Sequence, residues 1–377
     1  MKPACVADYR DAARKRLPKV LFDYIDGGAY AEATLAANSA DLAALTLRQR
    51  VLRDVSRIST NTELFGQPLS MPVVLAPVGL AGMYARRGEV QAARAARDAG
   101  LPFCLSTMGV CPVEEVAETV APWFQLYMIR DRGFMAELLG RVRAAGCPVL
   151  VITVDLPVAG ARYRDARSGL ASTTSSDRVR RALDGIMHAE WLLDVQIRGG
   201  PHTLGNIAGA SAGVKSLGEF WGWIAANFDP SVTWRDIDWV RERWDGPILL
   251  KGVLDAADAR DARSAGVEGI VVSNHGGRQL DSVHSGIRAL PSVADAVGSD
   301  LTVLMDGGVR SGLDVLKALA SGARACMIGR AWAFALGARG GAGVAHALDI
   351  IRKELLVAMT LTGCTDVQSA DRSLLAD

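Results

Sequence analysis

This sequence lacks paired cysteines, long apolar runs and an excess of charge of either sign. Its six cysteines are scattered and form no Cys-x-x-Cys pair, so neither a zinc site nor a redox dithiol is indicated. No apolar run reaches the roughly 18 residues that a membrane-spanning helix needs. The 42 lysines and arginines nearly balance 41 aspartates and glutamates, which gives no basic surface for nucleic acid. We therefore expect no metal and no nucleic-acid partner.

Signals for export and for two common nucleotide sites are also missing. Residues 1–8 lack the apolar core of a signal peptide, and with unpaired cysteines this predicts a soluble or peripherally bound protein of a reducing compartment. Neither the G-x-G-x-x-G nor the G-x-x-x-x-G-K-[ST] motif occurs, which disfavours a Rossmann dinucleotide site and a P-loop.

What the sequence does contain is a repeat of short apolar runs and helical segments. Half of the residues are apolar and 22% are charged, which favours a large buried core over disorder. Eight apolar runs are typical of strands buried in a parallel sheet: 73–77, 103–107, 123–128, 149–155, 247–252, 269–274, 302–307 and 325–329. Helical patterns separate them, and several end at a glycine suited to a helix C-terminus: Gly100, Gly146, Gly266 and Gly322. Eight such units in series predict an α/β fold, a closed TIM (β/α)8 barrel.

Two regions lie outside the repeat. Residues 1–72 are expected to form an N-terminal helical segment, and residues 166–245 form a long insertion after the fourth strand, so the barrel comprises 73–165 and 246–377 within a single domain of residues 1–377. The insertion carries six of the eight tryptophans: Trp191, Trp221, Trp223, Trp234, Trp239 and Trp244. For most of these tryptophans we expect that the insertion is helical and packs on the barrel through their aromatic rings. The alternative is that part of the insertion contacts a membrane or a partner, because tryptophan is frequent at such interfaces.

Polar side chains follow the predicted strands at their C-terminal ends. In a barrel of this kind these ends share one rim, which is where active sites lie. Each strand after the first supplies a polar group there: Ser106, Gln125, Tyr127, Thr153, Asp155, Lys251, Ser273, His275, Arg278, Asp306, Arg310 and Arg330. The sequence therefore predicts an active site at this rim.

The last two units resemble a phosphate site. Gly307, Gly308 and Gly329 leave backbone N–H groups bare at turns that enter helices, and Arg310 and Arg330 can add forked contacts. Phosphate sites after the seventh and eighth strands recur in such barrels. The alternative is that these glycines only permit tight turns, and we favour phosphate binding because the pattern occurs at two adjacent strand ends.

The segment 273–281 is the most informative in the chain. His275 can take up a proton near neutral pH, and Arg278 can grip a planar anion. Asp155 and Arg162 follow the fourth strand and would face them across the rim. An aspartate beside a histidine fixes its tautomer and stabilises the imidazolium, so the four residues predict a proton-transfer site for an anionic substrate.

Several motifs together resemble the FMN-dependent L-2-hydroxy acid dehydrogenase/oxidase family, along essentially the whole chain. They are Tyr24-Ile25-Asp26-Gly27-Gly28, Gln125-Leu126-Tyr127, Thr153-Val154-Asp155, Gly160-Ala161-Arg162, Ser273-Asn274-His275-Gly276-Gly277-Arg278-Gln279-Leu280-Asp281 and Asp306-Gly307-Gly308-Val309-Arg310. Within the family, Ala76-Pro77-Val78-Gly79-Leu80 and Met359-Thr360-Leu361-Thr362-Gly363 fit the branch of bacterial respiratory L-lactate dehydrogenases.

The resemblance implies a role for each rim residue. His275 would be the base, with Asp155 behind it, and the substrate would be bound by Tyr24, Tyr127, Arg162 and Arg278. Lys251 would lie at the edge of the flavin where negative charge grows on reduction. The whole implied FMN set is Ala76, Pro77, Val78, Ser106, Gln125, Thr153, Lys251, Ser273, Asp306, Gly307, Gly308, Arg310, Gly329 and Arg330.

The implied activity is oxidation of L-lactate to pyruvate with FMN as cofactor and a quinone as electron acceptor. Gly79 favours a quinone weakly, because oxidases of the family tend to carry alanine at that position. Alternatives are a peroxide-forming 2-hydroxy acid oxidase, a mandelate-type dehydrogenase, an FMN barrel isomerase acting on a diphosphate, and a phosphate-binding scaffold without activity. The resemblance further implies a homotetramer and a cytoplasmic protein held peripherally at the inner membrane.

Overall fold

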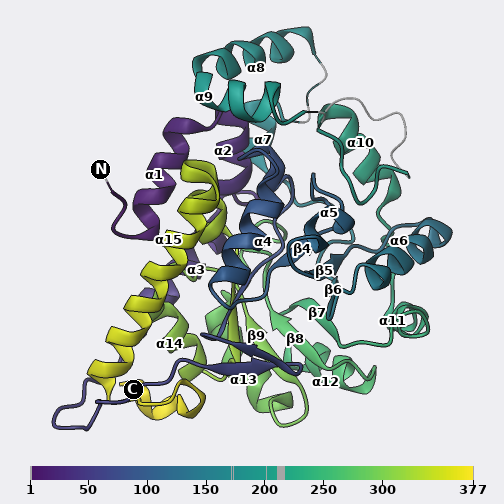
Figure 1. Ribbon diagram of the computed structural model, residues 1–377. Coiled ribbons are helices and arrows are strands. Elements are labelled where there is room, and N and C mark those ends of the chain that lie inside the picture. The colour runs from purple at the N-terminus through teal and green to yellow at the C-terminus, as the bar shows by residue number, and fades with distance from the viewer. Residues whose placement is uncertain (1, 171, 173, 201, 210–216, 377) are drawn as a thin grey trace.

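Eight parallel strands form a closed barrel at the centre of the computed structural model (Figure 1), which describes residues 2–170, 172, 174–200, 202–209 and 217–376. The strands are β3 (Val73–Leu75), β4 (Cys104–Ser106), β5 (Trp123–Leu126), β6 (Leu150–Thr153), β7 (Ile248–Val253), β8 (Gly269–Val272), β9 (Thr302–Met305) and β10 (Ala325–Ile328). They pair in the order β3-β10-β9-β8-β7-β6-β5-β4, and a parallel bridge between Leu75 and Phe103 joins the two ends. The predicted TIM barrel is confirmed, and each predicted strand overlaps an observed one.

The barrel closes because its strands are apolar on both faces. One face of each strand packs against the surrounding helices, and the other fills the interior with a separate cluster that includes Val74, Val151, Leu249 and Leu304. Strands buried on both sides require such continuous apolar sequence. The interior is therefore a packed core, and a ligand must bind above it, at the rim.

Helices follow the strands around the outside of the barrel. They are α4 (Gly88–Asp98), α5 (Val113–Ala117), α6 (Arg132–Ala144), α12 (Ala256–Ser264), α13 (Gly286–Val297), α14 (Gly312–Ala320) and α15 (Arg330–Thr362), with short turns η1 (Ala81–Met83), η3 (Val367–Ser369) and η4 (Arg372–Leu374). The four predicted terminal glycines all have positive φ, as a helix C-terminus requires: Gly100, Gly146, Gly266 and Gly322.

The N-terminal segment is helical only as far as Ala44. Its helices are α1 (Val6–Arg16), α2 (Lys19–Asp26) and α3 (Ala33–Ala44), and α1 lies along α15 (Figure 1). The expectation of a wholly helical segment to residue 72 is wrong for its last part, because β1 (Thr62–Leu64) and β2 (Gln67–Leu69) form an antiparallel hairpin. Phe65 at its turn packs edge-on against Trp123, so the hairpin closes the end of the barrel opposite the rim.

The insertion contains α8 (Ser175–Met187), α9 (Ala189–Trp191), the π-helical turn η2 (Leu192–Ile197), α10 (Leu217–Asn227) and α11 (Trp234–Arg241), and α7 (Tyr163–Ser168) leads into it. Trp191 and Trp244 are buried, Trp223 packs against the core, and Trp239 lies against Arg132 and Arg243. Packing through aromatic rings is thus confirmed for these four, while Trp234 is 39% exposed. The side chain of Trp221 and residues 171, 173, 201 and 210–216 lie outside the described part of the chain.

In the described residues, no helix combines the length and the apolar composition that crossing a membrane requires. The six cysteines are free thiols, five of them buried. The described residues also contain no group of three or more His, Cys, Asp or Glu side chains placed to hold a metal ion.

Candidate active site

A cavity of about 1160 Å³, its open mouth included, lies at the C-terminal ends of the strands. Its wall contains all but three of the predicted site residues: Tyr24, Ala76, Pro77, Val78, Ser106, Tyr127, Thr153, Arg162, Lys251, His275, Arg278, Asp306, Gly307, Gly308, Arg310, Gly329 and Arg330. The barrel brings these residues together because its strands run parallel and so end at the same rim.

The other three predicted residues lie directly behind the wall, each bonded to a residue in it. Asp155 bonds His275, Ser273 accepts a hydrogen bond from Lys251 at 2.9 Å, and the amide oxygen of Gln125 accepts from the Ser106 hydroxyl at 3.0 Å. They therefore orient the groups that a ligand would touch.

His275 has a strained backbone and a largely enclosed side chain, which is 17% exposed. Its φ is 59°, in the left-handed region, and its Nδ1 lies 2.9 Å from Oδ1 of Asp155. An ionised carboxylate only accepts, so it keeps the proton on Nδ1 and leaves Nε2 as the acceptor. Burial lowers the pKa of His275, and the charge of Asp155 only partly opposes this. The imidazole is therefore neutral at neutral pH and free to accept a proton.

Lys251 is a buried cation with a fixed counter-ion. Its Nζ lies 2.8 Å from Oδ2 of Asp306 and 2.9 Å from the Ser273 hydroxyl. Burial would lower the pKa of Lys251, but Asp306 and Asp155 raise it above its ordinary value. The ammonium group stays charged in the cavity wall, where it can stabilise negative charge on a bound ligand.

Arginine side chains of the wall repel one another. Burial and the charge of Arg278 lower the pKa of Arg162 to about 10, and burial lowers that of Arg310 to about 10. The pKa of Arg330 is depressed by burial and by the charges of Arg278 and Arg310. A bound anion would relieve this repulsion, so the cavity is electrostatically suited to carboxylate or phosphate groups.

The two segments predicted to bind phosphate differ in whether the helix start after them is capped by side chains. The start of α14 is already capped, because Asp314 accepts from the amides of Arg310 and Ser311, and Glu354 accepts from that of Gly312. These bonds occupy the amides of residues 310–312, whereas the N–H groups that the sequence predicts to be open are those of Gly307 and Gly308, which precede α14. By contrast, α15 begins at the cavity wall with Gly329 as its N-cap, and a Cβ on Gly329 would meet nothing closer than 3.9 Å.

Two of the residues predicted to bind phosphate also have structural roles. Gly308 has a φ of 85°, and a Cβ there would lie 2.0 Å from the carbonyl oxygen of Asn38 in α3, so glycine is needed for packing as well as for the turn. Arg330 donates to the carbonyl oxygens of Ile25, Gly27 and Gly276 at 2.7–2.8 Å. It thus also holds the N-terminal segment against the rim.

The insertion supplies wall residues that the sequence did not reveal. Ile224 and Phe228 lie one turn apart, both about 5% exposed, and line the cavity beside Tyr127, whose ring centroid is 5.0 Å from that of Phe228. Apolar spacing of this kind is usual in any packed helix, so no sequence signal marks it. Met108 and Leu156 also line the wall, and their positions just after strands β4 and β6 could have indicated them.

Asn206 ties the insertion to the strand end that carries Ser106. It is fully buried, its amide group donates to the Ser106 carbonyl at 3.1 Å, and its amide oxygen accepts from the Val113 amide at 2.7 Å. The described part of the insertion is therefore integrated into the site rather than appended to the barrel.

Comparisons with known proteins agree with this geometry. A family model described as FMN-dependent dehydrogenase matches residues 13–377. L-lactate dehydrogenase of Caulobacter sp. (strain K31) is 59% identical over 371 residues, 98% of this chain and 97% of the relative. L-lactate dehydrogenase of Pseudomonas syringae pv. syringae (strain B728a) is 56% identical over the same shares of the two chains. Among solved structures, the monotopic membrane protein (S)-mandelate dehydrogenase superposes with a TM-score of 0.92 at 35% identity over 100% of both chains. A mandelate oxidase with (S)-4-hydroxymandelic acid has a TM-score of 0.87 at 39% identity, over 99% of this chain and 98% of that one.

A closed barrel with a paired histidine and aspartate and with cationic groups around one rim cavity is typical of an enzyme that acts on anionic ligands. With the family model matched over nearly its whole length, the chain belongs to the FMN-dependent dehydrogenase family and is an oxidoreductase with FMN as cofactor.

Polar groups and open space in and around the cavity wall fit FMN. The Nε2 atom of Gln125 is buried beside the wall without a partner among the described residues, although an amide donor in such a position needs an acceptor. Open space above Gly329 and the neighbouring Arg310 and Arg330 suit a phosphate. A flavin mononucleotide, with ring carbonyls and one phosphate, offers both kinds of group.

Proposed function

We propose that this chain oxidises L-lactate to pyruvate, with His275 as the base and a quinone as the electron acceptor. The observation that carries the proposal is that His275, paired with Asp155 behind it, lies in the same cavity wall as Arg162 and Arg278. The names of the relatives support lactate, because those that are 56–59% identical along nearly the whole chain are L-lactate dehydrogenases, whereas the mandelate enzymes are 35–39% identical.

The substrate carboxylate is bound by Arg162 and Arg278 in this proposal. Both guanidinium groups line the cavity, and the depressed pKa of Arg162 reflects burial and a nearby like charge that an anion would offset. Burial raises the pKa of the Tyr127 phenol, so Tyr127 stays protonated and can donate a hydrogen bond, as can Tyr24 beside it.

His275 then takes up a proton from the substrate. Oxidation of lactate to pyruvate releases two protons and two electrons, and Nε2 of a neutral imidazole is a suitable acceptor for one of these protons. Asp155 stabilises the imidazolium that forms, because its carboxylate lies 2.9 Å from Nδ1. FMN, when bound, would supply the sink for the two electrons and the second proton, which protein side chains lack.

The remaining predicted residues, in the wall and directly behind it, would hold FMN. Ser106, Gln125 and Thr153 would hydrogen-bond the ring, with Ser273 orienting Lys251 toward its polar edge. Backbone from Ala76, Pro77 and Val78 would pass alongside it. The phosphate would lie with Arg310, Gly329 and Arg330, near Asp306, Gly307 and Gly308.

Membrane contact would bring the enzyme to its quinone. The support is an exposed apolar surface, here called the α8–η2 face, made of Val179, Leu183, Ile186, Met187, Leu193 and Ile197, which are 51–81% exposed. Within α8, Val179, Leu183 and Ile186 are spaced by four and three residues, as on one helix face, and α8 lies on the far side of the barrel from the β1–β2 hairpin (Figure 1). Apolar helix faces with flanking arginines bind membrane interfaces. A structural relative is itself described as monotopic.

The central experiment is anaerobic mixing of the FMN-loaded protein with L-lactate while the flavin absorbance is recorded. We expect bleaching by L-lactate, much slower bleaching by D-lactate and by (S)-mandelate, and reoxidation by a soluble quinone without stoichiometric peroxide in air. Faster bleaching by mandelate would favour the mandelate-type alternative, and stoichiometric peroxide would favour an oxidase. No bleaching by any 2-hydroxy acid would refute the proposal.

The membrane part has its own test. Replacing Leu183, Ile186 and Met187 with glutamine should reduce sedimentation with anionic vesicles, and replacing Val357 and Leu361, which are exposed on α15, should leave it unchanged. Equal sedimentation of the two variants would contradict contact through the α8–η2 face. The proposed cytoplasmic face and homotetramer are tested separately, by fractionation of cells and by light scattering of the purified protein.

A further inference from the structure

Arginine side chains on the cavity side hold the short segment that carries Tyr24. Arg330 donates to the carbonyl oxygens of Ile25 and Gly27 at 2.8 and 2.7 Å. Arg278 donates to the carbonyl oxygens of Tyr24 and Gly27, and its guanidinium lies 4.7 Å from the centroid of the Tyr24 ring. The position of residues 24–27 therefore sets the position of Arg278 as well as that of Tyr24.

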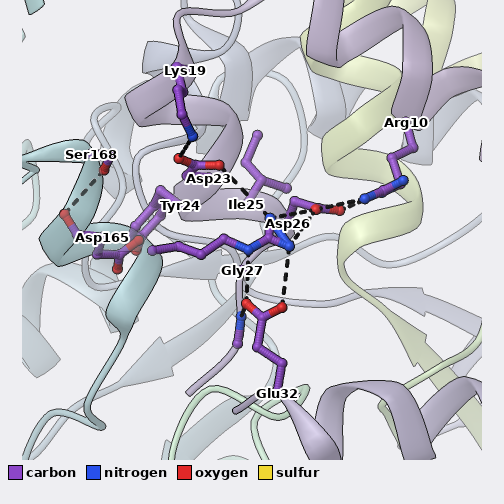
Figure 2. Close-up of polar contacts among 12 residues, drawn as sticks. Arg10, Lys19, Asp23, Tyr24, Ile25, Asp26, Gly27, Glu32, Asp165 and Ser168 are labelled. Atoms are coloured by element: carbon purple, nitrogen blue, oxygen red, sulfur yellow. Dashed lines mark hydrogen bonds and ion pairs between the residues drawn. The ribbon is translucent and has the colours of Figure 1, made fainter. Parts of the chain in front are cut away.

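On the side away from the cavity, the same segment is held through the buried carboxylate of Asp26 (Figure 2). Arg10 of α1 binds it with a fork, Nε to Oδ1 at 2.5 Å and Nη2 to Oδ2 at 2.8 Å. Arg164 binds Oδ2 with both terminal nitrogens at 2.7 and 2.9 Å. Burial would raise the pKa of Asp26, but the two arginines lower it below its ordinary value, so the carboxylate is ionised.

Arg164 makes a second set of contacts that Arg10 does not make. Its Nε lies 2.9 Å from Oε1 of Glu32, and its Nη1 lies 3.8 Å from Oδ1 of Asp23 (Figure 2 shows the carboxylates around Asp26). Arg164 lies in α7, two residues after Arg162. One guanidinium thus joins the element that carries Arg162 to the segment that carries Tyr24.

We propose that Arg164 is a positioning residue that sets the distance between the two halves of the substrate carboxylate site. One half is Arg162 on the approach to α7, and the other is Tyr24 with Arg278, whose guanidinium bonds the same segment. The inference rests on the proposed function only in that the ligand is a 2-hydroxy acid. It assigns a role to the network of Arg164, Asp26 and Glu32, none of which lines the cavity.

A purely electrostatic role of Arg164 and a positioning role predict different effects of charge removal on the affinity for the anionic ligand. Removing the charge of Arg164 would weaken binding of an anion, whereas removing the charge of Asp26 would leave the region more positive and strengthen it. If the network positions the site, both changes break the same link, so both should weaken binding. The two single changes therefore discriminate between the roles by the sign of their effects.

Arg10 provides a matched control. It carries the same charge as Arg164 and binds the same carboxylate, but it comes from α1 and does not join α7 to α2. A cavity lined by Arg10, Asp23, Asp26 and Arg164 opens behind the network, so water can reach the carboxylates when either arginine is shortened. Loss of either side chain should therefore be tolerated by the fold.

The test measures binding of 2-hydroxy-2-methylpropanoate, which has the carboxylate and hydroxyl of the substrate but no hydrogen on Cα. Binding is followed by the absorbance change of bound FMN. We expect Arg164→Met and Asp26→Asn each to raise the dissociation constant by about tenfold, the scale of coupling within one salt-bridge network, and Arg10→Met to raise it by less than about threefold. Arg164→Lys, which keeps the charge but loses the fork, should fall between wild type and Arg164→Met.

Three results would overturn the inference. They are tighter binding by the Asp26→Asn variant, equal effects of Arg10→Met and Arg164→Met, or a parallel tenfold loss of FMN affinity in the Arg164 variants, which would indicate general damage. The unchanged dissociation constant of FMN is therefore part of the expected result. Failure of the wild-type flavin to be bleached by L-lactate would refute the proposed function instead, and it is measured independently of this binding series.

Discussion

The contact between Asp155 and His275 gives the sharpest test of the acid–base assignment. The two groups are 2.9 Å apart, and their side chains are 13% and 17% exposed. Changing Asp155 to asparagine removes one negative charge with almost no change in volume. The amide can also donate to Nδ1, which would place the proton on Nε2 and remove the acceptor that the mechanism needs.

The size of the effect follows from the strength of the lost interaction. A hydrogen bond to a charged group contributes about 1.5–3 kcal/mol. If this stabilises the imidazolium only after proton uptake, its loss slows the step by about ten- to a hundredfold, at roughly 1.4 kcal/mol per factor of ten. The charge of Asp155 also raises the pKa of His275 against the lowering by burial, so in the variant this pKa falls further.

The variant should therefore change two separate quantities, the rate at saturating substrate and the pH at which that rate is lost. Anaerobic stopped-flow reduction of the flavin by saturating L-lactate should give a lower plateau rate. The loss of rate on acidification, which in wild type lies below the ordinary histidine pKa of about 6.5, should move to still lower pH. The control is Asp281→Asn, because Asp281 accepts from the Thr34 amide at 2.7 Å and lies in the same segment as His275. A wild-type rate in Asp155→Asn, or a shift of the acid limb to higher pH, would refute the reasoning.

Three further predictions concern the base, the packing and the pocket. His275→Gln should nearly abolish flavin reduction while FMN stays bound, and a normal rate would contradict the role of His275 as base. Gly308→Ala should lower the free energy of unfolding in urea by more than about 3 kcal/mol, because its Cβ would meet backbone at 2.0 Å with a φ of 85°. Gly140→Ala on α6, where a Cβ meets nothing within 4 Å, is the control and should stabilise by about 0.5–1 kcal/mol. Ile224→Ala should raise the ratio of kcat/KM for mandelate over lactate by about tenfold, and an unchanged ratio would exclude this residue from the substrate wall.

Much of the candidate site could be predicted from the sequence, because the C-terminal ends of all strands of a parallel barrel lie at one rim. Once eight apolar runs are recognised, the residues after them must meet at that rim, and the cavity wall indeed contains residues as distant as Ser106 and Arg330. The turns with positive φ could also be predicted, because a helix C-terminus often requires a left-handed backbone conformation that favours glycine. These are properties of short segments and of their repeat.

The roles that depend on contact between distant segments could not be predicted in this way. Arg330 looks like a phosphate ligand in the sequence, yet three backbone carbonyls also bind it, and the amides at the start of α14 are already capped by Asp314 and Glu354. Whether a donor is free depends on which acceptors the fold brings beside it, and no local pattern encodes that.

The sequence by itself determined the barrel, its rim and the chemical inventory there, since apolar periodicity and residue type act over a few neighbouring positions. Tertiary structure alone decided that Ile224 of α10 and Phe228, just after it, line the cavity. It also decided that a hairpin rather than a helix closes the opposite end, and that Arg164 joins α7 to Asp26. Each of these depends on side chains that are far apart in the chain packing against one another, and such packing is settled only when the whole core is assembled.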